Sequence, residues 1–157
     1  MVYRYLEKLE QACLISRVKR YDIAAKRTLK QVEKQFVVDN GFLLACNDSN
    51  KIFVAHALEN LVYNELLYRG YDVKIGKTYK GEIDFVAMKD GKKCFIQVAY
   101  LLSSDDVIER EFCAFDSVRD PSPKYVFSLD EYDMSKDGIT HFNIEEWLLS
   151  KVNITLS

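Results

Sequence analysis

The chain has 157 residues, a length that suits one domain of ordinary size, and 48% of these residues are apolar. A charged fraction of 29% and low glycine and proline counts exclude a fibrous or mostly disordered chain. The formal net charge of −2 gives the whole molecule no bulk attraction to nucleic acid or membrane surfaces.

Targeting signals and cysteines indicate the compartment. No signal peptide is visible, and no apolar run approaches the ~20 residues of a membrane span. None of the four cysteines forms a C-x-x-C pair and only two histidines exist, which argues against a zinc site. Cys13 and Cys94 lie in apolar runs, where free thiols serve as small core residues. We therefore expect a reduced, cytoplasmic protein with no membrane partner.

The first 46 residues form a basic segment. Residues 1–35 hold nine Lys/Arg against four Asp/Glu, a balance of +5. Apolar residues at helical spacing open the chain, a strand with the basic run Arg17, Lys19 and Arg20 follows, and Asn40-Gly41 predicts a turn. This is typical of the second half of a winged helix, whose basic residues contact DNA. The alternative is a plain helix and hairpin packed on the main domain, with a solvated basic surface.

The polar run Asn47–Asn50 predicts a boundary between residues 1–46 and a main domain over residues 51–157. Because earlier helices of a winged helix are missing, the sequence suggests a fragment of a longer protein or a degenerate stand-alone copy. The main domain is expected to contain helices over 54–69, 105–118 and 144–149, and strands over 71–75, 82–88, 94–102, 124–129 and 139–142. This order, α-β-β-β-α-β-β-α, predicts a mixed α/β fold.

Three polar residues stand out once these elements are placed: Glu59 on the first long helix, Asp84 on the second strand and Gln97 on the third. A polar side chain between Ile96 and Val98 needs a partner, because a buried unpaired polar group costs ~1–3 kcal/mol. Oxygen ligands of this kind are what Mg²⁺ prefers. The alternative is that Gln97 only forms a hydrogen bond across the strands to Asp84. His56 and His141 have no partner recognisable from sequence.

An Asp followed at this distance by Glu-x-Lys, after a helix bearing Glu, marks the PD-(D/E)XK nuclease superfamily, which these residues resemble. The resemblance implies a restriction-endonuclease-like mixed sheet flanked by helices, with Glu59, Asp84 and Gln97 as catalytic and metal-binding residues for Mg²⁺ or Mn²⁺. Ala99 stands where the lysine belongs. That lysine orients the attacking water and stabilises negative charge.

A narrower resemblance covers nearly the whole chain. The segments Val2-Tyr-Arg-Tyr-Leu-Glu-Lys-Leu, Glu82-Ile-Asp-Phe-Val-Ala and Ile96-Gln-Val-Ala-Tyr look like the C-terminal region of prokaryotic AAA+-type ATPases. In those proteins an ATPase module and a winged helix precede a nuclease-like domain of unknown function. The chain has no Gly-x-x-x-x-Gly-Lys-Ser/Thr loop, so we do not expect it to bind ATP itself.

Two functions follow. The first is an accessory, non-catalytic module that binds DNA or a protein partner, such as an upstream ATPase module. The second is a weak or atypical nuclease that depends on Mg²⁺ or Mn²⁺. The loss of the lysine and the neutral Gln97 favour the first, because each missing charge-stabilising group typically costs orders of magnitude in rate.

Overall fold

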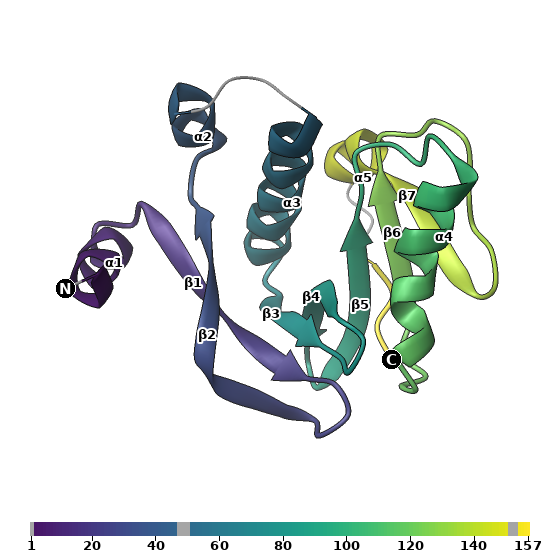
Figure 1. Ribbon diagram of the computed structural model, residues 1–157, viewed down its shortest axis with the longest axis horizontal. Coiled ribbons are helices and arrows are strands. Elements are labelled where there is room, and N and C mark those ends of the chain that lie inside the picture. Colours follow the sequence, from purple (N-terminus) through teal and green to yellow (C-terminus); the bar gives the residue numbers. More distant parts are fainter. Residues whose placement is uncertain (1, 47–50, 151–153) are drawn as a thin grey trace.

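A computed structural model describes residues 2–46, 51–150 and 154–157 of the chain (Figure 1). Within these residues one mixed sheet contains seven strands in the order β2-β1-β3-β4-β5-β6-β7. The strands are β1 (Ile15–Asp22), β2 (Arg27–Val37), β3 (Asp72–Lys77), β4 (Glu82–Lys89), β5 (Lys92–Val98), β6 (Lys124–Ser128) and β7 (Ile139–Asn143). The helices are α1 (Val2–Gln11), α2 (Asn40–Cys46), α3 (Lys51–Tyr68), α4 (Asp105–Cys113), the 3₁₀-helix η1 (Ala114–Ser117) and α5 (Ile144–Leu149).

The sheet is covered on both faces. One apolar cluster contains Val62 and Leu66 of α3 with Trp147 of α5, packed on the sheet residues Phe85 and Ile96. On the opposite face, α4 and η1 contribute to a second apolar cluster. The mixed α/β class predicted from the sequence is therefore confirmed. None of the described helices is both long enough and apolar enough to cross a membrane.

The predicted order of elements is confirmed, including the β4–β5 turn. Asp90 and Gly91 have φ of 53° and 75°, the left-handed values that a two-residue hairpin turn requires. Three predictions at element ends were wrong. Asn40-Gly41 begins helix α2, the third main strand ends at Val98, and the helix from Asp105 ends at Cys113 before η1. The predicted boundary at Asn47–Asn50 lies outside the described residues.

The basic hairpin belongs to the main sheet. β1 pairs antiparallel with β2 and parallel with β3, with Arg20 opposite Ile75. Helix α1 projects from the far end of this hairpin, and none of its residues is buried (Figure 1). Cys13, predicted as a core residue, is exposed, because it follows this projecting helix. Cys94 is buried as predicted, and burial raises the pKa of its thiol to about 12.

Candidate functional site

A β-bulge positions Asp84. Lys74 of β3 is paired with Val86 and Gly76 with Ile83, so two residues of β4 lie opposite one residue of β3. Such bulges re-aim a side chain and bend the strand. The β4–β5 ladder runs from Lys89–Lys92 to Phe85–Ile96 and ends there. Asp84 thus lies where β4 leaves β5, while the ladder between β4 and β3 continues to Lys77–Glu82.

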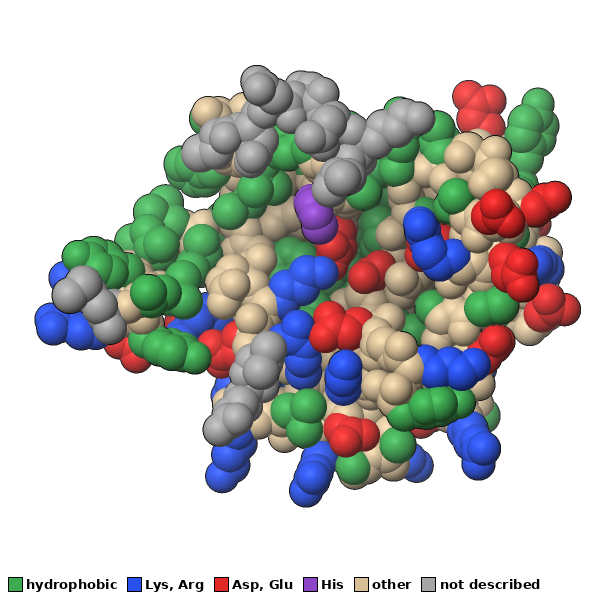
Figure 2. Space-filling view, in the orientation of Figure 1, with side chains coloured by type: hydrophobic (Ala, Val, Ile, Leu, Met, Phe, Trp, Pro, Cys, Tyr) green, Lys and Arg blue, Asp and Glu red, His purple; other side chains and the backbone are tan. Residues whose placement is uncertain are grey.

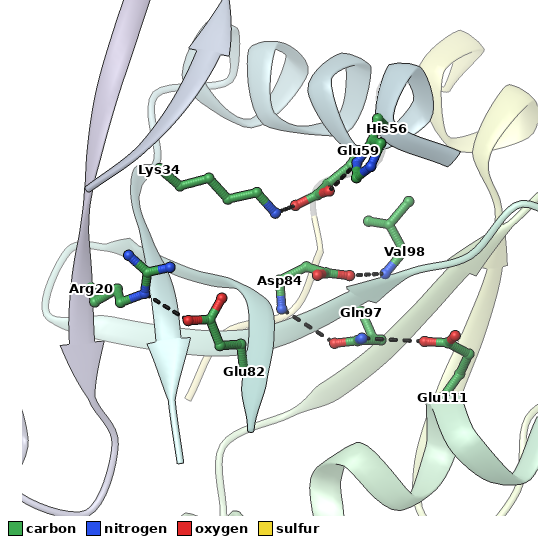
Figure 3. A network of polar contacts seen from close by, with 9 residues as sticks. All are labelled: Arg20, Lys34, His56, Glu59, Glu82, Asp84, Gln97, Val98 and Glu111. Carbon is green, nitrogen blue, oxygen red and sulfur yellow. Dashed lines mark hydrogen bonds and ion pairs between the residues drawn. The ribbon is translucent and has the colours of Figure 1, made fainter. Parts of the chain in front are cut away.

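Beyond the end of this ladder, β4 and β5 exchange side-chain hydrogen bonds (Figure 3). The Asp84 N–H donates to Gln97 Oε1 at 3.2 Å, and the Val98 N–H donates to Asp84 Oδ2 at 2.8 Å. The two side chains therefore satisfy backbone groups that the ladder no longer pairs. The cross-strand alternative predicted for Gln97 is confirmed, although its partner is the backbone of Asp84 and not the carboxylate.

Glu111 of α4 is a member of the site that sequence reasoning missed. Only 7% of its surface is exposed, and its Oε2 accepts a hydrogen bond from Gln97 Nε2 at 3.2 Å. The Arg110 guanidinium donates to Glu111 Oε1 through Nε at 3.0 Å and through a terminal nitrogen at 2.7 Å. Both carboxylate oxygens are thus engaged. A glutamate within an otherwise apolar helix face is the only sequence signal that could have identified it.

Glu59 lies on α3 above Asp84 and is paired with a lysine from β2 (Figure 3). The Lys34 ammonium donates to Glu59 Oε1, and His56 Nδ1 lies 3.8 Å from Glu59 Oε2. The Glu59 side chain is 10% exposed, whereas that of Lys34 is 30% exposed. A cation therefore reaches the site from the N-terminal hairpin, 25 residues before Glu59. The sequence did not predict this contact, because it depends on β2 joining the main sheet.

Asn60, beside Glu59, holds the hairpin against α3. Its side-chain amide accepts from the Val37 N–H at 2.8 Å and donates to the Val37 carbonyl at 2.9 Å and to Asn40 Oδ1 at 2.6 Å. Asn60 is 3% exposed, so these bonds replace water for both partners. This clamp fixes the end of β2 and thereby the approach of Lys34.

The Asp84 carboxyl is hard to ionise. Part of its surface reaches solvent, yet the protein packed around it and the negative charge of Glu59 raise its pKa to about 7. Glu111 adds to the rise, whereas the Val98 N–H and Lys34 oppose it. Crowded, desolvated carboxylates shift in this direction because the charged form loses hydration and gains repulsion. The site is therefore electrostatically unusual, as functional sites often are.

Ala99 occupies the lysine position, and its surroundings are apolar. It is 6% exposed and belongs to the cluster that includes Leu102 and Phe112. Its N–H donates to the Phe127 carbonyl at 2.8 Å, which continues the sheet toward β6. A lysine introduced at this position would have to place its ammonium among these side chains or reach past them.

The described arrangement does not fit a divalent cation. No group of three or more His, Cys, Asp or Glu residues in the described part of the chain is placed to hold a metal ion. Gln97 Oε1, the predicted neutral ligand, accepts the Asp84 N–H, and Glu59 is paired with Lys34. The roles of Glu59, Asp84 and Gln97 as metal ligands stay a prediction.

The three predicted DNA-binding residues lie on β1 but differ in their partners. Arg17 pairs with Glu10 at 2.7 Å and Glu33 at 3.4 Å, and Arg20 pairs with Glu82 at 2.7 Å. Lys19 is exposed. Two of the three cations are therefore neutralised within the protein, which weakens their attraction for phosphate.

A second buried polar cluster lies between β6 and β7. His141 Nε2 lies 2.8 Å from Ser128 Oγ, and His141 Nδ1 accepts the Met134 N–H at 3.3 Å. Nδ1 is therefore unprotonated and Nε2 carries the hydrogen, which it donates to Ser128. The Ser128 hydroxyl donates in turn to Asp130 Oδ2 at 2.7 Å. The histidine thus cannot accept the serine proton, and the arrangement is not that of a nucleophilic triad.

Comparisons with known proteins add a relative but no function. No protein-family model matches the chain, and no solved structure matches it. A protein of Haemophilus influenzae described as "Uncharacterized protein" is 35% identical over 149 residues. The match covers 94% of this chain but 36% of the relative, so the chain spans about a third of that protein's length.

Proposed function

We propose that the chain is a nuclease-like accessory module that binds a protein partner and does not cleave nucleic acid. The restriction-endonuclease-like assignment is supported by the positions of Glu59, Asp84 and Gln97 on α3, β4 and β5, in the order that the PD-(D/E)XK resemblance requires. The association with a larger ATPase-type protein comes from the sequence resemblance. It agrees with a relative that extends well beyond the matched region.

The observation that supports a non-catalytic role is that each polar residue of the site is already bonded to a protein group. Lys34 neutralises Glu59, the Val98 N–H binds Asp84, and Gln97 links Asp84 to Glu111. A phosphodiester-cleaving centre needs carboxylate oxygens available to a metal and a cation aimed at the developing charge. Here the carboxylates hold protein groups, and the lysine position is an alanine.

The proposal that the chain binds a protein partner rests on the N-terminal arm. We define this arm as α1 and α2 with the ends of β1 and β2 next to them. Its apolar side chains gather at the left of the molecule in Figure 2. The exposed fractions are 70% for Val2, 74% for Tyr3, 63% for Tyr5, 50% for Phe42 and 61% for Leu44. Contiguous exposed apolar surface of this kind marks protein interaction sites. Because Arg17 and Arg20 are paired, a protein partner is favoured over DNA.

Hydrogen exchange tests the docking of this arm. We expect the backbone amides of α1 in this chain to exchange fast, because none of its residues is buried. In the whole Haemophilus influenzae relative, the equivalent helix should be protected by the remainder of that protein. Equal exchange in the whole relative and in its matched region alone would contradict the proposal. The equivalent of α3 serves as the internal control, since it is covered in both.

A nuclease remains the second candidate, and Lys34 is the observation that favours it. Its ammonium beside Glu59 could supply the positive charge that Ala99 does not. Incubation with supercoiled plasmid and Mn²⁺ separates the candidates. We expect no cleavage. Cleavage that is lost in Asp84→Ala and in Lys34→Ala, but retained in the exposed-site variant Asp133→Ala, would establish the nuclease instead.

A further inference from the structure

We propose that a cavity separate from the Asp84 site binds a nucleoside phosphate. It lies between the turn of the β1–β2 hairpin, the β3–β4 turn and the loop that follows η1, and has a volume of ≈ 470 Å³. This volume is in the range of small-ligand sites. The inference is independent of the proposed function, because none of the cavity residues belongs to the polar site around Asp84.

Two cations from different segments of the chain line the same cavity. Lys26 lies in the hairpin turn and Arg119 follows η1, and within the described residues neither side chain forms an ion pair or hydrogen bond. The nearby carboxylate of Asp120 does not neutralise them, because it is paired with Lys93 at 2.6 Å and accepts from the Ser122 hydroxyl at 2.6 Å. Basic side chains also project along the lower edge of Figure 2, where Figure 1 places the hairpin turn.

An exposed aromatic ring completes the site. Tyr79 of the β3–β4 turn lines the cavity, and 83% of its surface is exposed. Nucleobases stack on such rings with little regard to their identity. One phosphate carries two negative charges and several acceptor oxygens, which match Lys26 and Arg119. A ring for the base and a cationic pair for the phosphate therefore point to a mononucleotide unit.

The test is calorimetric titration of the whole chain with AMP, GMP, CMP, UMP and inorganic phosphate at low salt. We expect the nucleotides to bind more tightly than phosphate. The double variant Lys26→Ala/Arg119→Ala should bind at least about tenfold more weakly, since charge-assisted hydrogen bonds are lost. The charge-matched control is Lys8→Ala/Arg4→Ala on exposed α1, which should bind as the parent chain does. Equal binding by both double variants, or no nucleotide binding, would overturn the proposal.

Titration with a 5′-phosphorylated oligothymidylate shows whether the bound nucleotide is free or is the end of a strand. Tighter binding than UMP indicates the end of a strand, and weaker binding indicates a free nucleotide.

Discussion

Two buried polar clusters lie at different places in the same sheet, and they differ in how many charged groups they contain. The Asp84 cluster comprises Lys34, Glu59, Asp84, Gln97 and Glu111. The His141 cluster comprises Ser128, Asp130 and His141. The first crowds three carboxylates around one another, whereas the second surrounds a single carboxylate with neutral donors. Both are hydrogen-bonded to other protein groups, but only the first resembles a catalytic motif in sequence.

In the Asp84 cluster, residues that resemble a catalytic motif have a structural role. Asp84 and Gln97 keep two strands together where their ladder ends, a role that requires these side chains without any chemistry. The excess of negative charge and the burial of Asp84 nevertheless make this carboxyl costly to ionise, whereas in the His141 cluster the group that burial makes costly to ionise is the histidine. The two clusters should therefore respond differently to mutation and to pH.

The largest effect is expected from Asp130→Ala, which tests whether the His141 cluster is structural. Asp130 Oδ2 accepts from the Leu102 N–H at 2.7 Å and from the Ser128 hydroxyl, whose residue is 0% exposed. Loss of the acceptor leaves both donors unpaired, and we expect ~3 kcal/mol lower unfolding free energy by urea denaturation. Asp133→Ala in the exposed part of the same loop should cost well under ~1 kcal/mol. Equal effects would contradict the assignment.

Asp84→Asn should raise the unfolding free energy, whereas Asp130→Ala should lower it. The folded pKa of about 7 lies above the ordinary aspartate value of 3.8, so the stability contributed by the protonated carboxyl is present below pH 3.8 and lost as pH rises to about 7. An asparagine can still accept the Val98 N–H. We expect the variant to be ~1–2 kcal/mol more stable than the parent above pH 7 and little different near pH 4. Destabilisation at every pH would show that the ionised carboxylate is needed.

Lys34→Met tests the cation of the Asp84 cluster. The Glu59 side chain, which is only 10% exposed, would lose its ion-pair partner. Because the Lys34 side chain is 30% exposed, solvent screens the pair, and we expect the unfolding free energy to fall by a moderate ~1–2 kcal/mol. The double variant Lys34→Met/Glu59→Gln should recover most of the loss, because no uncompensated charge remains. Thermal melts of the two single variants and the double variant measure this coupling. Additive losses would mean that the two side chains do not interact.

The smallest effect is the pH response of the His141 cluster. Burial lowers the pKa of His141 below 6.5, and the opposing charges of Asp130 and Asp133 do not overcome it. Stability is therefore present above pH 6.5 and lost as pH falls through the folded pKa, opposite to the Asp84 cluster. In the Asp84→Asn background, which removes the opposite slope of that carboxyl, we expect a loss of up to ~1 kcal/mol between pH 7 and pH 5. This slope should vanish in His141→Gln and persist in His56→Gln, which changes the exposed histidine.

Much of the fold could be predicted because its signals are local. Helical spacing located α1 and α3, and the Asp90-Gly91 pair located the β4–β5 turn. Asn40-Gly41 misled because turn-forming residues also suit a helix start, where the Asp39 carboxylate accepts the Gly41 N–H at 2.7 Å. The exposure of Cys13 was missed because an apolar run does not reveal that its helix lacks a covering element.

The site could be predicted only where its members share a hairpin or an adjoining helix. Glu59, Asp84 and Gln97 were found because a known order of elements relates them. Lys34 and Glu111 were missed, since the first arrives by β1 joining β3 and the second by α4 folding back over β5. Contacts of this kind depend on tertiary packing, which leaves no periodic signal in a single sequence.

The most direct test of the central claim is a crystal structure of the chain grown with Mn²⁺, with anomalous scattering used to locate the ion. We expect no manganese within coordination distance of the Asp84 carboxylate. We also expect the Lys34–Glu59 ion pair and the Gln97–Glu111 hydrogen bond to stay in place. Manganese bound by Asp84, with Glu59 turned from Lys34 toward the ion, would contradict it.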